Sequence, residues 1–210
     1  MISLCMIIKN EEKYLPDCLQ SVQGIVDEII IVDTGSTDNS IKIAEEFNAR
    51  IFQFTWIGDF SAARNYSLQN ASGDWILYLD ADERLNNNSV QELKRITAES
   101  CKKAYWCNVI SLDEINKHPS VMSYARLFPN NKKVRFTGTI HEQIEPSLIE
   151  NGFSIEKSLI EIIHLGYSVS EEEIKKKAER NLELLLNEFQ ASGSGYYAFQ
   201  LGQTLGILKR

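Results

Sequence analysis

Two aspartates, Asp80 and Asp82, stand two positions apart in the string Asp80-Ala81-Asp82-Glu83, directly after the short apolar segment Trp75–Leu79. On an extended backbone, side chains at positions i and i+2 point to the same side, so Asp80 and Asp82 could share one ligand. Carboxylate oxygens suit Mg²⁺ or Mn²⁺, which commonly bind phosphate oxygens as well. The string favours a divalent-metal site, and an ordinary acidic loop after a strand is the alternative.

A second polar cluster, Asp33-Thr34-Gly35-Ser36-Thr37-Asp38, ends the apolar run Glu28–Val32. Gly35 allows a sharp turn, and Ser36 or Thr37 can cap the helix that follows. Asp33 is also a carboxylate at the end of a strand, where it can accept hydrogen bonds from a nucleobase or a ribose. The capping and binding interpretations are compatible.

A basic residue, Arg64, follows two alanines in the helical segment from Asp59 to Gln69. Small neighbours permit close approach of a ligand, and the forked guanidinium group suits a diphosphate. An exposed arginine on an amphipathic helix is an equally good interpretation of this residue alone.

The elements that must position these residues alternate between strand and helix over the first 80 positions. We expect strands at Ser3–Ile8, Glu28–Val32, Arg50–Thr55 and Trp75–Leu79, with helices at Pro16–Val22, around Ile41–Phe47 and at Asp59–Gln69. Short connections of this kind predict a parallel α/β sheet, which binds ligands at the carboxyl ends of its strands. The clusters at Lys9-Asn10-Glu11, Asp33–Ser36 and Asp80–Asp82 all fall at that edge.

The pattern changes after Asn88. We expect a helix at Val90–Glu99, strands at Ala104–Leu112 and Val121–Phe128, an irregular stretch through Glu145, and a strand ending at Ile160–His164. From Ser170 the chain reads as helical, with Gly193-Ser194-Gly195 separating two helices before Arg210.

Composition excludes several classes of protein. The 210 residues carry a net charge of −7, which gives no bulk attraction to nucleic acid or anionic lipid. The longest apolar runs, Leu4–Ile8 and Trp75–Leu79, fall far short of the ~20 residues of a membrane span. The N-terminus lacks the features of an export signal, and the four cysteines form no C-x-x-C pair. We expect buried thiols and a cytoplasmic protein, with peripheral association at the inner face of the membrane left open.

Four ordered strings together resemble a family 2 glycosyltransferase with the GT-A fold. They are Ser3–Glu12, Ile31–Asp38, Asp59–Asn65 and Gly73–Glu83. The resemblance is strong over residues 2–84 and thinner to about residue 168. It implies a mostly parallel central sheet flanked by helices, with a C-terminal helical tail.

That resemblance also implies a chemistry. Such enzymes take a sugar from a nucleotide-diphospho-sugar donor, usually UDP-linked, and invert the anomeric carbon. Asn10, Glu11 and Asp33 would hold the nucleoside. Asp80 would lie near the ribose or the metal, and Asp82 would bind the Mn²⁺ or Mg²⁺ that bridges the phosphates. Many members carry a second Asp where this chain has Thr34. Because of this departure, selectivity for uracil does not follow from the resemblance.

Inversion requires a general base on the acceptor side, while the metal and Arg64 offset charge on the leaving diphosphate. The His-Glu pair in Gly138–Gln143 resembles one in the subgroup with the same acidic motifs, so Glu142 is the expected base and His141 its neighbour or substitute. A polar loop without chemistry is the alternative. His164 is a further candidate metal ligand, although a lone histidine at a strand end is often structural.

The expected organisation is a catalytic domain over 1–168 with a helical tail over 169–210. The first part divides into a nucleotide-binding half (1–84) and an acceptor-side half (85–168). The tail resembles the start of tetratricopeptide-like repeats, which would offer a surface for contact with another protein. The alternative is a pair of helices that only packs on the catalytic domain. The acceptor could be a saccharide, lipid, peptide or protein. Two other functions stay open: a haloacid dehalogenase-type phosphotransferase, and a non-catalytic binding or scaffold module.

Overall fold

The computed structural model describes residues 1–99, 102–111, 119–165 and 171–209. Its strands are β1 (Ile2–Ile8), β2 (Glu28–Asp33), β3 (Arg50–Gln53), β4 (Trp75–Tyr78), β5 (Glu83–Leu85), β6 (Lys103–Ser111), β7 (Ser120–Pro129) and β8 (Ser154–His164). Its α-helices are α1 (Leu15–Val22), α2 (Ser40–Glu46), α3 (Phe60–Asn70), α4 (Val90–Thr97), α5 (Glu145–Glu150), α6 (Glu171–Ser192) and α7 (Gly195–Ile207).

Within these ranges the strands form one sheet in the order β3-β2-β1-β4-β7-β6-β8-β5. The first four strands in this order are parallel, as the alternation of strands and helices predicts. Strand β7 then runs antiparallel to both β4 and β6, β8 is parallel to β6, and β5 is antiparallel to β8. The sheet is therefore mixed, with its parallel part in the N-terminal half.

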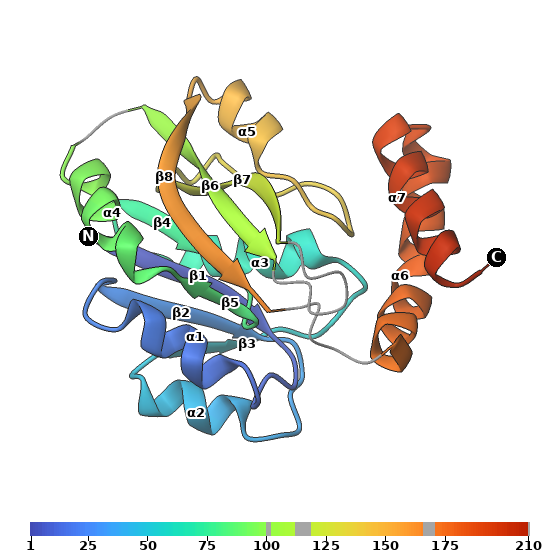
Figure 1. Ribbon diagram of the computed structural model, residues 1–210, viewed down its shortest axis with the longest axis horizontal. Helices are drawn as coiled ribbons and strands as arrows, with labels where there is room; N and C mark the ends of the chain where they lie inside the picture. The colour runs from blue at the N-terminus through green and yellow to red at the C-terminus, as the bar shows by residue number, and fades with distance from the viewer. Residues whose placement is uncertain (100–101, 112–118, 166–170, 210) are drawn as a thin grey trace.

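Helices cover both faces of the sheet, because the central strands are apolar on both sides. The larger core lies between the sheet and α1, α2 and α4, and includes Leu19, Ala44 and Leu93. The opposite face packs against α3 and α5 through Leu68 and Leu148. Figure 1 shows α6 and α7 standing apart from these layers, beyond the carboxyl ends of β1 and β2.

The amino-terminal edge of the sheet is held by one carboxylate. Glu28, at the start of β2, accepts hydrogen bonds from the Ser3 hydroxyl and from the backbone N–H groups of Ser72 and Gly73, and it pairs with Arg50. Burial raises the pKa of Glu28, but these hydrogen bonds outweigh it and bring the pKa down to about 2. Glu28 thus ties β1, β3 and the turn before β4 to β2.

Gly73 allows that turn to approach β1 closely. A Cβ atom at Gly73 would lie 2.6 Å from Ser3 Oγ, 2.9 Å from Ser3 N and 3.0 Å from the Met1 carbonyl oxygen. Two of these atoms belong to the backbone and cannot move aside easily. A side chain at this position would therefore push the β4 turn away from β1.

Within the described residues, the sequence predictions missed β5, α5 and a short 3₁₀ helix at Asn87–Ser89. Strand β5 has only three residues, and α5 begins at Glu145, where the sequence was expected to stay irregular. Cys5, Cys18 and Cys107 are buried free thiols, as expected. The predictions that involve Cys101, Leu112, the domain boundary at 168, Ser170 and Arg210 lie outside the described residues. None of the helices in the described ranges is both long and apolar enough to cross a membrane.

Candidate functional site

The loops that follow β1 and β2 are connected by hydrogen bonds. The Asn10 side-chain oxygen accepts a hydrogen bond from Thr37 N–H at 2.7 Å, and Asn10 N–H donates to Ser36 Oγ at 2.9 Å. Asn10 has φ 56°, a left-handed conformation that asparagine tolerates better than most residues. The loop after β1 is thus shaped by the Ser36-Thr37 segment, and Asn10 is a structural link between the two loops.

A second set of contacts, which the sequence analysis did not identify, continues this link. Glu12 accepts hydrogen bonds from the backbone and side-chain N–H groups of Asn39, and Glu12 N–H donates to Asp38. Glu11 N–H donates to Ser40 Oγ at 2.7 Å. These are reciprocal polar pairs between two loops about 27 positions apart, and no local pattern predicts them.

Asp33 ends β2 as predicted, but its carboxylate is buried and already engaged. It accepts hydrogen bonds from Gly35 N–H at 3.1 Å and from Ser36 N–H at 3.1 and 3.2 Å. Gly35 has φ 106°, which a residue with a side chain rarely adopts. These are the contacts of a sharp turn. The expectation that Ser36 or Thr37 caps the next helix was wrong, because α2 begins at Ser40 without a side-chain cap, and both residues bind Asn10 instead.

Glu11 faces the acidic strand ends. Burial raises the pKa of its carboxyl to about 7, and the negative charges of Asp82 and Asp80 add to this rise while Lys177 on α6 opposes it. Three acidic side chains from two separate loops thus act on one another at this edge. A cation or a cationic side chain is the natural partner for such an arrangement.

Arg64 lies on α3 and joins two carboxylates. Its Nη2 donates to Asp80 Oδ1 at 2.7 Å, and its Nε donates to Glu142 Oε1. The guanidinium group also lies over the ring of Tyr78 at 5.2 Å. The Arg64 side chain is only 9% exposed, so the exposed-helix interpretation of this residue is wrong.

Arg126 and Glu83 extend this network, and the sequence analysis missed both. Arg126 on β7 donates through Nη2 to Glu83 Oε1 at 2.6 Å, and the same nitrogen lies 3.7 Å from Asp80 Oδ2. Burial raises the pKa of Glu83 to about 7, with Arg126 opposing this rise. The other carboxylate oxygen of Glu83, Oε2, accepts a hydrogen bond from Asp80 N–H at 2.8 Å. Asp80 is therefore held between Arg64 on α3 and Arg126 on β7.

The segment from Asp80 to Asp82 is a turn, closed by Glu83 N–H donating to the Asp80 carbonyl at 3.0 Å. The assumption of an extended backbone was wrong, because a turn removes the i, i+2 relation between the side chains. The two carboxylates accordingly have different partners. Asp80 contacts the arginines, whereas Asp82 Oδ2 lies 3.4 Å from His164 Nε2.

Asp82 and His164 form the pair with the chemistry of a metal site. Burial lowers the pKa of His164, but its hydrogen bond to Asp82 and the nearby carboxylates outweigh this effect and raise it. His164 Nδ1 is 3.0 Å from Ser111 Oγ, which fixes the orientation of the ring. Among the described residues, no three His, Cys, Asp or Glu side chains gather closely enough to hold a metal ion by themselves.

The loop with His141 and Glu142 reaches the same edge from the other half of the chain. Its ends are joined by paired backbone hydrogen bonds between Thr137 and Gln143, at 2.9 and 3.0 Å. Gly138 has φ 93° and His141 has φ 49°. A histidine in this region carries local strain, which persists only where the surroundings hold it.

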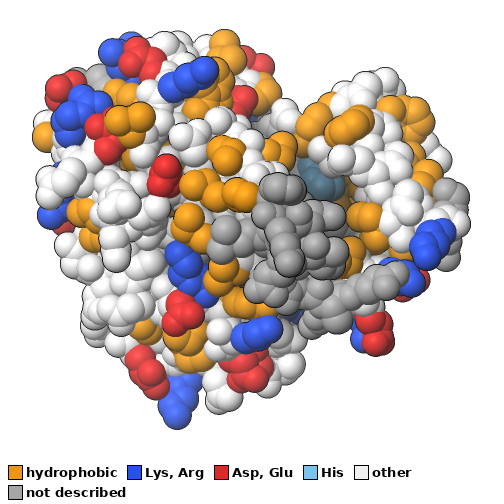
Figure 2. All heavy atoms as spheres, in the orientation of Figure 1, with side chains coloured by type: hydrophobic (Ala, Val, Ile, Leu, Met, Phe, Trp, Pro, Cys, Tyr) orange, Lys and Arg blue, Asp and Glu red, His pale blue; other side chains and the backbone are white. Residues whose placement is uncertain are grey.

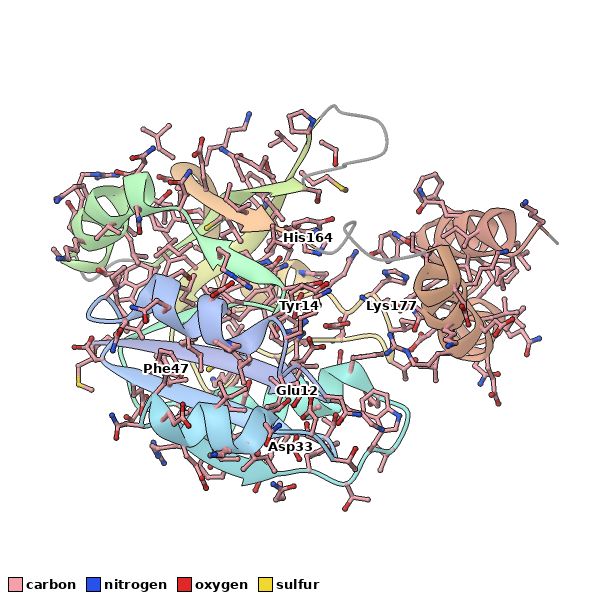
Figure 3. The ribbon with its side chains drawn as sticks, turned by 60° about the horizontal axis from the view of Figure 1, so that its bottom comes forward. Glu12, Tyr14, Asp33, Phe47, His164 and Lys177 are labelled. Carbon is pink, nitrogen blue, oxygen red and sulfur yellow. The ribbon has the colours of Figure 1, made fainter. Side chains whose placement is uncertain are left out.

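The structure therefore brings Arg64, Asp80 and Glu142 into direct contact, and Asp82 and His164 into a second pair. Asn10 and Asp33 lie at the neighbouring strand ends, where Asn10 binds the loop after β2 and Asp33 binds its own loop. Figure 3 shows Asp33, Glu12 and His164 within the main body, with Lys177 opposite them on α6. A separate surface cavity of about 570 Å³, lined by residues such as Asn65, Lys133 and Asn151, does not include any of these side chains.

The sheet order, the helices on both faces and the polar loops at the carboxyl edge define a GT-A type α/β fold, the fold of nucleotide-diphospho-sugar transferases. Solved structures share it. Staphylococcus aureus TarS 1-349 aligns with a TM-score of 0.63 and 16% identity over 86% of this chain and 65% of that one. The same protein in complex with UDP-GlcNAc aligns with a TM-score of 0.59 and 16% identity, over 98% of this chain and 79% of that one.

The particular family follows from the sequence profile described as Glycosyl transferase family 2, which matches residues 3–148, and the chain belongs to this family. A TPR repeat-containing protein of Synechococcus elongatus is 40% identical over 148 residues, which are 70% of this chain and 36% of that protein. The prophage-derived glycosyltransferase SunS of Bacillus subtilis is 31% identical over 87% of this chain and 44% of its own length. The chain thus spans less than half the length of these two relatives.

Proposed function

We propose that the chain transfers a sugar from a UDP-linked donor to an acceptor nucleophile, with inversion at the anomeric carbon. The observation that carries this proposal is the buried Arg64, paired with Asp80 and Glu142 at the carboxyl edge of a GT-A type sheet. The complex of TarS with UDP-GlcNAc supports a UDP-linked donor. Family membership favours this activity over the phosphotransferase and scaffold alternatives.

The nucleoside is assigned to the loops after β1 and β2. Glu11 offers a carboxylate that faces the strand ends, and Asn10 fixes the shape of its loop. Asp33 keeps acceptor capacity beyond its two backbone donors, because each carboxylate oxygen has two lone pairs. In this assignment Asp33 orients the nucleoside loop and accepts at most one further hydrogen bond from the donor.

A divalent cation fits beside the diphosphate. Asp82 and His164 supply a carboxylate oxygen and an imidazole nitrogen that already lie close together, and donor phosphate oxygens would complete the ligand set. An imidazole ligand favours Mn²⁺ over Mg²⁺. Asp80 suits a metal less well than these two, because Arg64 and Arg126 already pair with it. When bound, the metal would offset negative charge on the leaving diphosphate.

Glu142 is assigned as the general base. It takes the proton of the acceptor hydroxyl while the acceptor oxygen bonds to the anomeric carbon and the bond from that carbon to the diphosphate oxygen breaks. Arg64 can exchange Glu142 for a diphosphate oxygen as the donor enters, which frees the carboxylate. His141 is the substitute. Burial lowers its pKa, with Glu142 opposing, so its imidazole is neutral and can accept a proton at neutral pH.

The residues described above say more about the donor than about the acceptor. Saccharides, lipids, peptides and proteins all carry suitable nucleophiles, and the chain spans only part of its relatives. Exposed Phe199 and Ile207 on α7 suit a protein contact through the C-terminal helices.

Calorimetry of UDP binding, with and without Mn²⁺, tests this proposal. We expect Mn²⁺ to strengthen UDP binding by about tenfold or more, and Asp82→Asn to remove that gain. Asp17→Asn, on the exposed surface of α1, is the matched control and should behave as the unmodified chain. A screen of donor hydrolysis with several nucleotide sugars then identifies the sugar. UDP binding that is absent, or indifferent to Mn²⁺ and to Asp82, would contradict the proposal.

The base assignment has its own test. Glu142→Gln should keep UDP binding and lose donor turnover. His141→Asn should keep UDP binding and retain most of the turnover. The reverse result would exchange the roles of the two residues.

A further inference from the structure

Helix α6 is fixed to the loop that carries His141 and Glu142. The Glu188 carboxylate on α6 accepts a hydrogen bond from Thr139 N–H at 2.5 Å. Leu185 is fully buried and packs with Ile140 and with Leu201 of α7. The orientation of α6 relative to the carboxyl edge of the sheet is therefore set by specific contacts.

Helix α7 contacts the same loop. Tyr197 packs so closely against Gly138 that a Cβ atom there would lie 2.2 Å from the tyrosine oxygen. Tyr196 Oη donates to the His141 carbonyl at 3.4 Å. In the space-filling view of Figure 2, the lobe formed by these helices meets the main body across a notch bordered by hydrophobic side chains.

Two basic side chains on α6, Lys177 and Arg180, lie toward the main body. Lys177 and Arg180 are one helical turn apart, and both are exposed. The Arg180 guanidinium lies 5.6 Å from the centre of the Phe60 ring, at the start of the helix that carries Arg64. Figure 3 shows Lys177 on the side of α6 that faces the main body.

Charge interactions agree with this geometry. Although Arg180 is exposed along its length, the protein around its guanidinium group limits hydration and lowers its pKa, and the Glu11 carboxylate opposes this effect. Lys177 in turn lowers the pKa of Glu11. Neither the Lys177 ammonium group nor the terminal nitrogens of Arg180 have an ion pair within the described part of the chain. Lys176, in contrast, points elsewhere and pairs with Glu172 at 3.2 Å.

The donor diphosphate needs more positive charge than the sheet edge supplies. Carboxylates there belong to Glu11, Asp33, Asp80, Asp82 and Glu142, and the guanidinium groups of Arg64 and Arg126 are already paired with Asp80, Glu83 and Glu142. Unpaired cations that face this edge attract a polyanion, and do so most strongly where solvent is partly excluded.

We propose that Lys177 and Arg180 on α6 bind the diphosphate of the nucleotide sugar, and so complete the donor site from the side of the C-terminal helices. This inference rests on the proposed function, because it assigns the ligand of the same site. It makes α6 a binding element of the enzyme, although the family profile ends at residue 148. Lys177 and Arg180 lie on the helix that also contacts the His141 loop through Glu188. Donor binding and the orientation of Glu142 therefore both depend on the position of α6.

Calorimetry with UDP and with uridine, in the presence of Mn²⁺, tests the proposal. We expect Lys177→Ala and Arg180→Ala each to weaken UDP binding by roughly five- to tenfold, and the double variant to weaken it further. Uridine has no diphosphate, so its affinity should not change. Lys176→Ala, one position away with the same charge, is the matched control and should match the unmodified chain. Lys177→Arg should restore most of the UDP affinity.

Each result decides the matter. UDP binding unchanged in the double variant would overturn the inference and leave the proposed function standing. An equal loss for UDP and uridine would also overturn it, because it would indicate lost packing of α6. No UDP binding by the unmodified chain would overturn both proposals together.

Discussion

The ion pair between Arg64 and Glu142 permits a quantitative test of the site. Arg64 contacts two carboxylates that differ in exposure, since the Glu142 side chain is 11% exposed and that of Asp80 is 38% exposed. Removing the Arg64 guanidinium group leaves the Glu142 carboxylate without its partner in a poorly hydrated position. Removing the charge of Glu142, by contrast, leaves Arg64 paired with Asp80. The two single changes should therefore have unequal costs.

The magnitudes follow from this asymmetry. Arg64→Met should lower the free energy of unfolding by roughly 3–5 kcal/mol, the usual cost of breaking a buried pair from one side. Glu142→Gln should cost about 1 kcal/mol, because the amide oxygen can still accept from Arg64 Nε. The double variant should cost little more than Arg64→Met alone. That pattern gives a coupling energy of about 1 kcal/mol, because the cost of Glu142→Gln nearly disappears once Arg64 is absent.

Urea denaturation at pH 7 measures the four free energies of this cycle. The pair of Arg95 and Glu92 on α4 is the control, since it has the same residue types and an Nε to Oε2 distance of 2.7 Å, with 62% of the arginine side chain exposed. Its coupling energy should be at most about 0.5 kcal/mol. If Arg64→Met prevents folding, Arg64→Lys completes the cycle at lower cost. Additive losses at Arg64 and Glu142, or a coupling no larger than that of the control, would refute the buried pair.

Three further outcomes concern stability. Gly73→Ala should lower the free energy of unfolding by roughly 1–3 kcal/mol, because the new methyl group overlaps the backbone of Ser3, and urea titration should show this. Gly202→Ala, in the interior of α7 with open space around the added atom, should raise the thermal midpoint through about 0.5–1 kcal/mol of stabilisation. Glu28 has its folded pKa lowered to about 2, so it stabilises the fold above its unfolded pKa, and that contribution, at most roughly 3 kcal/mol, is lost as pH falls from about 4.5 toward 2. Glu28→Gln should flatten this part of the stability profile in acid denaturation, and an unchanged profile would contradict the assignment.

The strands and helices of the first half were predictable because local signals agree with tertiary packing. Strand β2 is a β-branched run buried at its centre, and Gly35 stands where a left-handed turn is needed. Strand β5 gives no such signal, since three residues are too few to show periodicity. Its position depends on pairing with β8, about 80 residues later.

The site was predictable as a set of residues and less so as a set of contacts. Asp80 was correctly expected at the carboxyl edge and Arg64 on its helix, but the contact between them was not predicted, and the turn at Asp80–Asp82 separates the two carboxylates. Arg126 gave no sequence signal, because an arginine within an apolar strand acquires meaning only from the acids across the sheet. The contact of Glu188 with Thr139 is equally non-local.

The place of β8 in the sheet has a consequence for synthesis of the chain. Strand β8 lies between β6 and β5, although it is the last strand to be made. Until His164 has left the ribosome, one side of β6 and the whole of β5 lack a hydrogen-bonding partner. Unpaired strand edges are prone to join other chains. The nascent polypeptide therefore passes through a stage in which β1 to β4, β7 and β6 can already assemble, while β5 and one side of β6 stay unpaired until β8 is made.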